Sequence, residues 1–301
     1  MKQENLSKRN FNSISPSAKS LLLLKGYTNI PFARQTAELL LAPEKYSPDF
    51  NKREMTFWAR VFHFENRYWS IDSLLEDLQI KNILELSSGF SFRSLDTSSK
   101  KDFYYIDTDL PDVINLKKDF LTALKNENHD NEGQLEILPL NCLDEQQFHE
   151  IISHFPEGEI VIVNEGLLMY LDLKEKENLC KIIHKILKER GGFWITADIY
   201  LKNNHEKLDF EISDETKDFF LQHSIEEKKF NSFEEAESFF RRMGFLIDKE
   251  AYIKHSELSA IRHFLKNVSA KQLFKIRKKG KIQATWRLRV ADVPIGNGPQ
   301  M

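Results

Sequence analysis

The sequence contains only two cysteines, Cys142 and Cys180. They lie far apart and near no cluster of Cys and His, which excludes a disulfide framework and argues against a zinc site. Long apolar runs are absent near the N-terminus, where the longest, Leu21 to Leu24, is too short for a signal peptide or a membrane span. We therefore expect a cytoplasmic protein with no metal and no membrane partner.

The chain has nearly equal numbers of basic and acidic residues. The chain has 43 Lys and Arg residues against 46 Asp and Glu residues, a formal net charge of -3. No overall field therefore favours nucleic acid or an anionic membrane as a partner. A basic run does occur from Lys271 to Lys281, but no ladder of aromatic residues accompanies it. We interpret this run as a solvated helix end rather than a phosphate-binding patch.

At 301 residues and 41% hydrophobic composition, the chain can bury one large core without disulfides or metals. We expect one domain, in which residues 1–79 form a helical cap and residues 80–293 form the core with helical insertions. The tail 294–301 carries Gly, Pro and Asn and is predicted to be disordered.

The cap region is rich in aromatic residues. The pattern predicts a helix over 17–25 that ends at Gly26, a second helical segment between Pro31 and Pro43, and a longer helix over 55–78. In the longer helix, apolar residues recur at three- and four-residue steps, which is typical of packing against a sheet. The stripe consists of Phe57, Val61, Phe64, Tyr68, Ile71 and Leu75.

From residue 80 onward, strand and helix patterns alternate, which predicts an α/β fold. The expected strands cover 83–86, 103–107, 135–138, 159–163, 192–199, 245–252 and 281–290. Pro111 begins a helix, Asp172 caps another, and Gly244 ends a third. A charged, mostly helical excursion is expected over 202–229, and a second helical excursion over 256–278.

The stretch from Lys81 to Arg93 reads as the first strand followed by a small-residue turn at Ser87 to Ser91. In open α/β sheets, ligands bind beyond the carboxyl ends of the strands. Glu85 at the end of this strand, and an acidic strand end at Asp107 about twenty residues on, suit a ribose beside a close backbone turn.

Glycine is scarce in this turn. A dinucleotide site needs three glycines, whereas only Gly89 is present and Ser87 stands where the first would fall. A ligand without phosphates, such as S-adenosylmethionine, is therefore favoured over a pyrophosphate, and a nicotinamide oxidoreductase is disfavoured. The side chain at Ser87 restricts the freedom of the turn.

Three motifs of the chain resemble successive motifs of the leucine carboxyl methyltransferase family. They are Ile83–Arg93 (ILELSSGFSFR), Tyr105–Pro111 (YIDTDLP) and Asn164–Leu171 (NEGLLMYL). Cap segments beginning at Ser17 and at Trp58 are also similar to that family, so the resemblance covers residues 14 to about 200. It implies a Rossmann-like class I methyltransferase fold, a seven-stranded and mostly parallel sheet whose last strand runs antiparallel between the fifth and sixth.

The resemblance also implies cofactor-binding roles, residue by residue. Lys19 and Arg60 match the cations that hold the methionine carboxylate of S-adenosyl-L-methionine, a task suited to an ammonium and a planar guanidinium. Asp109 matches the carboxylate that accepts the ribose hydroxyls, and Asp107 competes with it on spacing alone. The remaining matches are Gly89 in the turn, Asn141 and Cys142 beside the adenine, and Glu165 near the amino group or the reacting methyl.

The mechanism that this cofactor implies is alignment of an acceptor oxygen with an activated methyl group, leaving S-adenosyl-L-homocysteine as product. A carboxylate acceptor needs no base, whereas a hydroxyl must lose a proton, for which His63 and Tyr170 are the candidates. The resemblance is closest to bacterial O-methyltransferases of polyketide pathways, so a small-molecule acceptor is favoured. A protein C-terminal carboxyl methyltransferase and a binding module without catalysis stay as alternatives, and the oligomeric state stays open.

Overall fold

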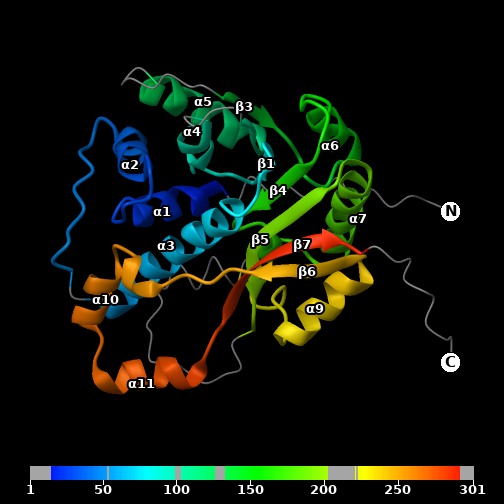
Figure 1. The fold of residues 1–301 in the computed structure, drawn as a ribbon. Helices are drawn as coiled ribbons and strands as arrows, with labels where there is room; N and C mark the ends of the chain where they lie inside the picture. Colours follow the sequence, from blue (N-terminus) through cyan, green and yellow to red (C-terminus); the bar gives the residue numbers. More distant parts are fainter. Residues whose placement is uncertain are drawn as a thin grey trace.

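The computed structural model describes residues 15–52, 54–98, 103–125, 133–202, 221 and 223–291. Its centre is a seven-stranded sheet of order β3-β2-β1-β4-β5-β7-β6, visible in Figure 1. All neighbours are parallel except β7, which is antiparallel to both β5 and β6. The expected antiparallel last strand between the fifth and sixth is confirmed. The strands are β1 (Asn82–Leu86), β2 (Tyr104–Asp109), β3 (Gln134–Pro139), β4 (Ile160–Asn164), β5 (Gly192–Tyr200), β6 (Phe245–Glu250) and β7 (Gln283–Val290).

Strands β1 and β4, in the middle of the sheet, are buried along their whole length. Successive side chains point to opposite faces of a strand, so a sheet covered on both sides takes continuous apolar runs. In β4, Ile160 and Ile162 belong to the core on one face, and Val161 and Val163 belong to the core on the other. This explains why the sequence shows no polar alternation at Ile160–Asn164.

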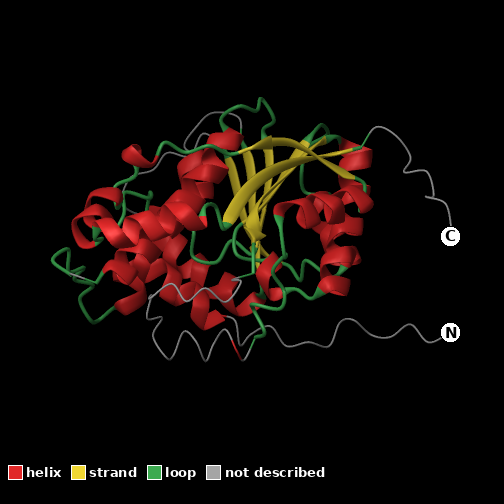
Figure 2. Cartoon of the chain, turned by 90° about the horizontal axis from the view of Figure 1, so that it is seen from below, coloured by secondary structure: helices red, strands yellow, loops and turns green. Residues whose placement is uncertain are grey.

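Helices cover both faces of the sheet, as Figure 2 shows from below. One core contains residues of α6 (Glu145–Ile152), α7 (Leu173–Arg190) and α9 (Phe233–Arg242) packed with strand residues. On the opposite face, Ile71 and Leu74 of α3 (Met55–Leu75) pack on the sheet. The short helix α4 (Arg93–Ser98) and α5 (Pro111–Lys125) contribute to a third core that they share with the cap.

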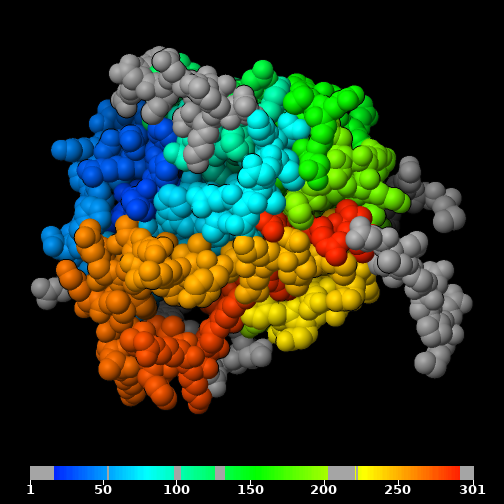
Figure 3. Space-filling model, in the orientation of Figure 1, coloured from blue at the N-terminus to red at the C-terminus, as the bar shows by residue number. Residues whose placement is uncertain are grey.

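The cap consists of α1 (Ser15–Lys25), α2 (Ala33–Leu41) and the first half of α3, joined by α10 (Ile261–Asn267). Segments from the two ends of the sequence therefore meet, and Figure 3 shows the blue and orange segments side by side. Two further elements follow β6, namely η4 (His255–Glu257) and α11 (Ala270–Lys279), whose residues are all at least partly exposed. Among the described residues, no helix has the length and apolar character needed to cross a membrane.

Some local expectations were wrong. The long cap helix ends at Leu75 rather than at residue 78, and the sixth strand ends at Glu250 rather than at residue 252. The short helix α6 was not expected. The signal for α6 was present, because Asp144 accepts hydrogen bonds from the backbone N–H groups of Gln146 and Gln147 as an N-cap.

The apolar stripe of α3 is not wholly core. Ile71 and Leu75 pack on the sheet as expected, whereas Val61 packs with α10 and Phe64 lines a cavity. The capping role of Asp172 is confirmed, with a capping box to Glu175. The predicted tail 294–301 and most of the excursion over 202–229 lie outside the described residues.

Candidate functional site

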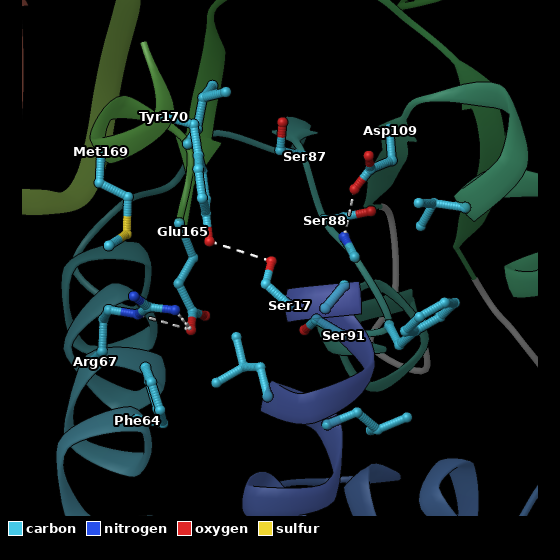
Figure 4. Close-up of a pocket in the computed structure, with 18 of the residues that line it drawn as sticks. Ser17, Phe64, Arg67, Ser87, Ser88, Ser91, Asp109, Glu165, Met169 and Tyr170 are labelled. Atoms are coloured by element: carbon cyan, nitrogen blue, oxygen red, sulfur yellow. Dashed lines mark hydrogen bonds and ion pairs between the residues drawn. The ribbon is translucent and has the colours of Figure 1, made fainter. Parts of the chain in front are cut away.

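A cavity of about 610 Å³ lies over the carboxyl ends of β1, β2, β4 and β5, covered by α1 and α3. Figure 4 shows the cavity with residues of α1 and α3 facing the strand ends. Its floor is the turn between β1 and α4, and its walls include the segments after β2, β3 and β4. This position is where ligands bind in open α/β folds.

The floor turn has an unusual backbone. Ser87 has φ 51° and Gly89 has φ 53°, so both residues occupy the left-handed region. That conformation is costly for serine and easy for glycine. The turn is fixed by hydrogen bonds from the Ser88 N–H to the Thr108 carbonyl at 2.9 Å and from the Gly89 N–H to Asp109 Oδ2 at 2.8 Å.

The two carboxylates of β2 have different surroundings. Asp109 lines the cavity, accepts the N–H groups of Gly89 and Leu110, and has a pKa that burial raises against those two hydrogen bonds. Asp107 is fully buried, does not line the cavity, and lies 2.9 Å from Lys117 Nζ. Ser94 also donates a hydrogen bond to Asp107. Of these two carboxylates, Asp109 is therefore the one placed to meet a ligand in this cavity.

A buried cluster of charges surrounds Glu165 after β4. Its Oε1 lies 2.7 Å from Lys25 Nζ and 3.0 Å from the Arg67 guanidinium, and its Oε2 lies 3.3 Å from Arg93 Nη2. Burial opposes ionisation of this carboxyl, but the three cations outweigh it and hold the pKa of Glu165 at about 2. Arg93 also pairs with Asp72 and lies 3.6 Å from Glu85. Glu165 is therefore ionised at neutral pH and joins the cap to the sheet through ion pairs.

Asp198 of β5 fixes the segment that carries Glu165. Its carboxylate accepts hydrogen bonds from the backbone N–H groups of Gly166, Leu167 and Leu168 at 2.7, 2.6 and 3.1 Å. Three successive amides that converge on one buried carboxylate leave the segment little freedom. This explains how a loop can present Glu165 to a cavity with a defined position.

Of the two cap cations expected at the cavity, only one lies there. Lys19 is exposed and does not line the cavity, whereas Lys25, six positions later on α1, is buried and lines it. Arg60 lines the cavity as expected. In the described part of the chain its guanidinium has no ion-pair or hydrogen-bond partner, and burial lowers its pKa. Among the residues that the structure describes, Arg60 is thus a cation at the cavity without a counter-charge.

A second cluster of polar side chains lies where α3 meets the end of β5. The Tyr200 hydroxyl lies 2.7 Å from His63 Nε2 and accepts a hydrogen bond from Arg67 Nη1 at 3.0 Å. Burial, reinforced by the charges of Arg67 and Lys229, lowers the pKa of His63 to about 3. Burial also raises the pKa of Tyr200 to about 12. At neutral pH both side chains are therefore uncharged.

The cavity brings together most of the residues that the sequence singled out. These are Arg60, His63, Glu85, Ser87, Gly89, Asp109, Asn141, Cys142, Glu165 and Tyr170. It does not include Lys19 or Asp107. Burial raises the pKa of Cys142 to about 12, so its thiol stays neutral, and the Tyr170 hydroxyl donates to Ser17 Oγ at 3.1 Å. The individual roles stay predictions.

Several lining residues were missed or given another interpretation. Lys25 follows four leucines, which reads as an ordinary helix end, and Tyr200 is the last residue of an apolar strand. Arg67 lies in the cap helix without any local motif that marks it, yet it lines the cavity and binds Glu165. Among the described residues, no group of three or more His, Cys, Asp or Glu side chains is placed to hold a metal ion.

The sheet order and the cavity over the carboxyl strand ends define a Rossmann-like α/β protein with a ligand-sized cavity at the usual place. The family model described as leucine carboxyl methyltransferase matches residues 14–184, more than half of the chain. The chain therefore belongs to the leucine carboxyl methyltransferase family. This confirms the family resemblance seen in the sequence.

Solved structures with similar folds were also found. An O-methyltransferase family protein from Burkholderia thailandensis has 13% identity and a TM-score of 0.47, over 86% of this chain and 64% of that one. The chain thus spans less than two thirds of that protein. Mitomycin 7-O-methyltransferase has 12% identity and a TM-score of 0.43, over 92% and 67%.

Magnesium protoporphyrin IX methyltransferase from Synechocystis has 7% identity and a TM-score of 0.45, over 78% of this chain and 86% of that one. All three TM-scores are below 0.5, so these likenesses carry no argument about the reaction. No curated protein matches the sequence.

Proposed function

We propose that the protein transfers a methyl group from S-adenosylmethionine to an oxygen atom of a small-molecule carboxylate. The observation that carries the proposal is Asp109, whose carboxylate is held at the cavity floor by the Gly89 N–H. A buried carboxylate beside a left-handed turn suits a nucleoside whose ribose hydroxyls need an acceptor.

The remaining lining residues suit the rest of the cofactor. Arg60, which lacks a counter-charge among the described residues, would bind the methionine carboxylate. Glu165 would face the cationic amino group, although Lys25 and Arg67 already neutralise part of its charge. Asn141 and Cys142 line the wall that an adenine would occupy.

The methyl acceptor would bind in the part of the cavity near Tyr200, and the side chains there favour an anion. The polar groups of this part include Tyr200, which accepts a hydrogen bond from Arg67, and Lys229, which pairs with the exposed Glu226, and its apolar lining includes Met169 and Phe64. A hydroxyl acceptor would need a base, and His63, with a pKa of about 3 among cations, is a poor one. A carboxylate is already ionised at neutral pH, so its methylation needs only positioning and exclusion of water. An apolar molecule that bears a carboxylate fits these surroundings best.

When bound, S-adenosylmethionine supplies the activated methyl group. The chain's own contribution is to hold the acceptor. If His63 donates its Nε2–H to the Tyr200 oxygen, that oxygen receives hydrogen bonds from both His63 and Arg67. The Tyr200 O–H is then free to donate to the carboxylate oxygen that is not methylated, which keeps the other oxygen aligned.

The proposal includes a role in secondary metabolism and a cytoplasmic location. The resemblance to polyketide-associated enzymes supports a role in secondary metabolism. The free thiols of Cys142 and Cys180 are compatible with the cytoplasm.

Calorimetric titration with S-adenosylhomocysteine and with NAD tests the cofactor site. We expect binding of the sulfur nucleoside only, and Asp109→Ala should weaken it by about 1.5–3 kcal/mol because a charge-assisted acceptor is lost. Asp119→Ala, on the exposed side of α5, serves as the matched control and should bind normally. Absence of sulfur-nucleoside binding by the wild type would refute the proposal.

Transfer of a labelled methyl group tests the reaction. We expect label in small carboxylic acids, and alkali should release it as methanol, because an ester hydrolyses whereas an ether does not. Alkali-stable label would indicate a hydroxyl acceptor. Label in the protein fraction would indicate a protein carboxyl methyltransferase, and binding without any transfer would indicate a non-catalytic module.

A further inference from the structure

The floor turn adopts a glycine-type conformation at a residue that is not glycine. Ser87 has φ 51° and lines the cavity, and the residue after it, Ser88, is buried. A serine leaves the left-handed region readily unless its neighbours prevent it. Something outside the turn must therefore hold this conformation.

Ser88 is held at three points. Its N–H donates to the Thr108 carbonyl at 2.9 Å, and its carbonyl accepts the Ser91 N–H at 3.0 Å. Its Oγ accepts a hydrogen bond from Lys117 Nζ at 2.8 Å. The first two contacts come from the backbone, so they would be available to any residue at this position. Only the contact with Lys117 depends on the serine side chain.

Lys117 is an unusual residue to find behind the turn. It lies on α5, has no exposed surface, and its ammonium lies 2.9 Å from Asp107 and 5.3 Å from the centre of the Phe92 ring. A buried lysine needs a counter-charge, which Asp107 supplies. The ammonium carries three N–H donors, and one of them is donated to the Ser88 hydroxyl, which ties the buried ion pair to the turn.

We propose that Lys117 is a positioning residue which, through the Ser88 hydroxyl, holds Ser87 in the left-handed conformation and so keeps the Gly89 N–H on Asp109. Lys117 and Ser88 thereby replace the glycines that this turn lacks. The proposal also gives Asp107 a role, since this carboxylate orients Lys117 rather than binding ribose. It rests on the proposed cofactor site at Asp109.

A rescue experiment tests the proposal, with S-adenosylhomocysteine as the probe in calorimetric titrations. Ser88→Ala removes the hydroxyl without burying an unpaired charge, and we expect it to weaken binding about tenfold, the loss of one hydrogen bond to a charged group. Ser87→Gly should restore affinity in the Ser88→Ala background to within about threefold of wild type, because glycine adopts φ > 0 without help. Ser153→Ala, at the exposed end of α6, is the matched control and should bind normally.

Two results would overturn the proposal. One is wild-type affinity of Ser88→Ala, and the other is a double variant that binds as weakly as Ser88→Ala alone, since glycine restores a conformation but not a lost contact. Denaturation curves identify a variant that fails to fold. In that case Lys117→Met combined with Asp107→Asn removes the charges as a pair, and Ser87→Gly should rescue it likewise.

Hydrogen exchange of the turn amides gives a readout that does not depend on the cofactor. Exchange at residues 87–91 should become faster in Ser88→Ala and return to the wild-type rate with Ser87→Gly. If wild type binds no sulfur nucleoside but this exchange pattern holds, the proposed function fails and the role of Lys117 stands. If wild type binds but the exchange rates of the variants do not differ, only the role of Lys117 fails.

Discussion

Neutralising Glu165 should destabilise the protein strongly, because this carboxylate joins the cap to the sheet. Glu165→Gln keeps the shape of the side chain and an oxygen that can accept from Lys25 and Arg67. It removes the negative charge that three buried cations share. The perturbation therefore tests the ion cluster rather than the packing of the site.

The size of the effect follows from the pKa of Glu165, which is about 2 in the folded protein against an ordinary value of 4.5. Since one pKa unit corresponds to about 1.4 kcal/mol, this difference contributes about 3 kcal/mol of stability at neutral pH. Breaking a buried ion pair by removing one partner costs about 3–5 kcal/mol, which agrees in magnitude. We expect Glu165→Gln to lower the free energy of unfolding by about 3 kcal/mol at pH 7.

Urea denaturation of wild type and Glu165→Gln at a series of pH values measures this effect. The folded pKa lies below the unfolded one, so the stabilisation is complete above about pH 4.5 and is lost as the pH falls toward 2. The two proteins should therefore differ at neutral pH and converge in acid. Glu237→Gln, which breaks an exposed pair with Arg241, is the matched control and should change stability by less than about 0.5 kcal/mol.

The reasoning is refuted by a loss smaller than about 1 kcal/mol at pH 7, which would be typical of an exposed pair. It is equally refuted if the difference between the two proteins stays constant between pH 5 and the acid limit of folding, since the cost would then not arise from the ionisation of Glu165.

Two further substitutions probe the core and the acceptor end, each by denaturation against an exposed residue of the same type. Phe240→Ala empties a site that is 1% exposed between sheet and α9, and should cost about 3–5 kcal/mol, whereas Phe274→Ala, 68% exposed, should cost less than about 0.5 kcal/mol. Tyr200→Phe leaves His63 Nε2 and Arg67 Nη1 without their hydroxyl partner and should cost about 1–3 kcal/mol, with a weaker affinity for the carboxylate acceptor. Tyr252→Phe, 86% exposed, is its control, and equal stability of the two Tyr variants would contradict the hydrogen-bond assignment.

Local patterns in the sequence determined most of the fold. The apolar runs at β1 and β4 predict buried parallel strands, because strands covered on both faces need no polar alternation. The capping residue Asp172 marks the start of α7, because its side chain satisfies an otherwise unpaired N–H group. These features depend only on residues close in the sequence, so they can be read without the structure. The position of β7 came from the family resemblance, since no local pattern states which strands are neighbours.

The assignment of particular charged residues to the cavity needed the tertiary structure. The family resemblance favoured Asp109 over Asp107, which competed with it on spacing alone. The packing of α5, which brings Lys117 to Asp107, leaves Asp109 at the cavity. Lys19 and Lys25 lie on the same helix, and the packing of α1 against α2 and α3 decided which of them is buried beside Glu165.

Ser87 shows the same division between sequence and structure. The sequence alone established that a turn poor in glycine follows the first strand, because residue types are local information. That the serine nevertheless adopts φ 51° depends on contacts from β2 and α5, which are distant in the sequence. A backbone conformation that is unfavourable for its residue persists only when contacts from other elements hold it in place. The sequence does not show which elements make those contacts.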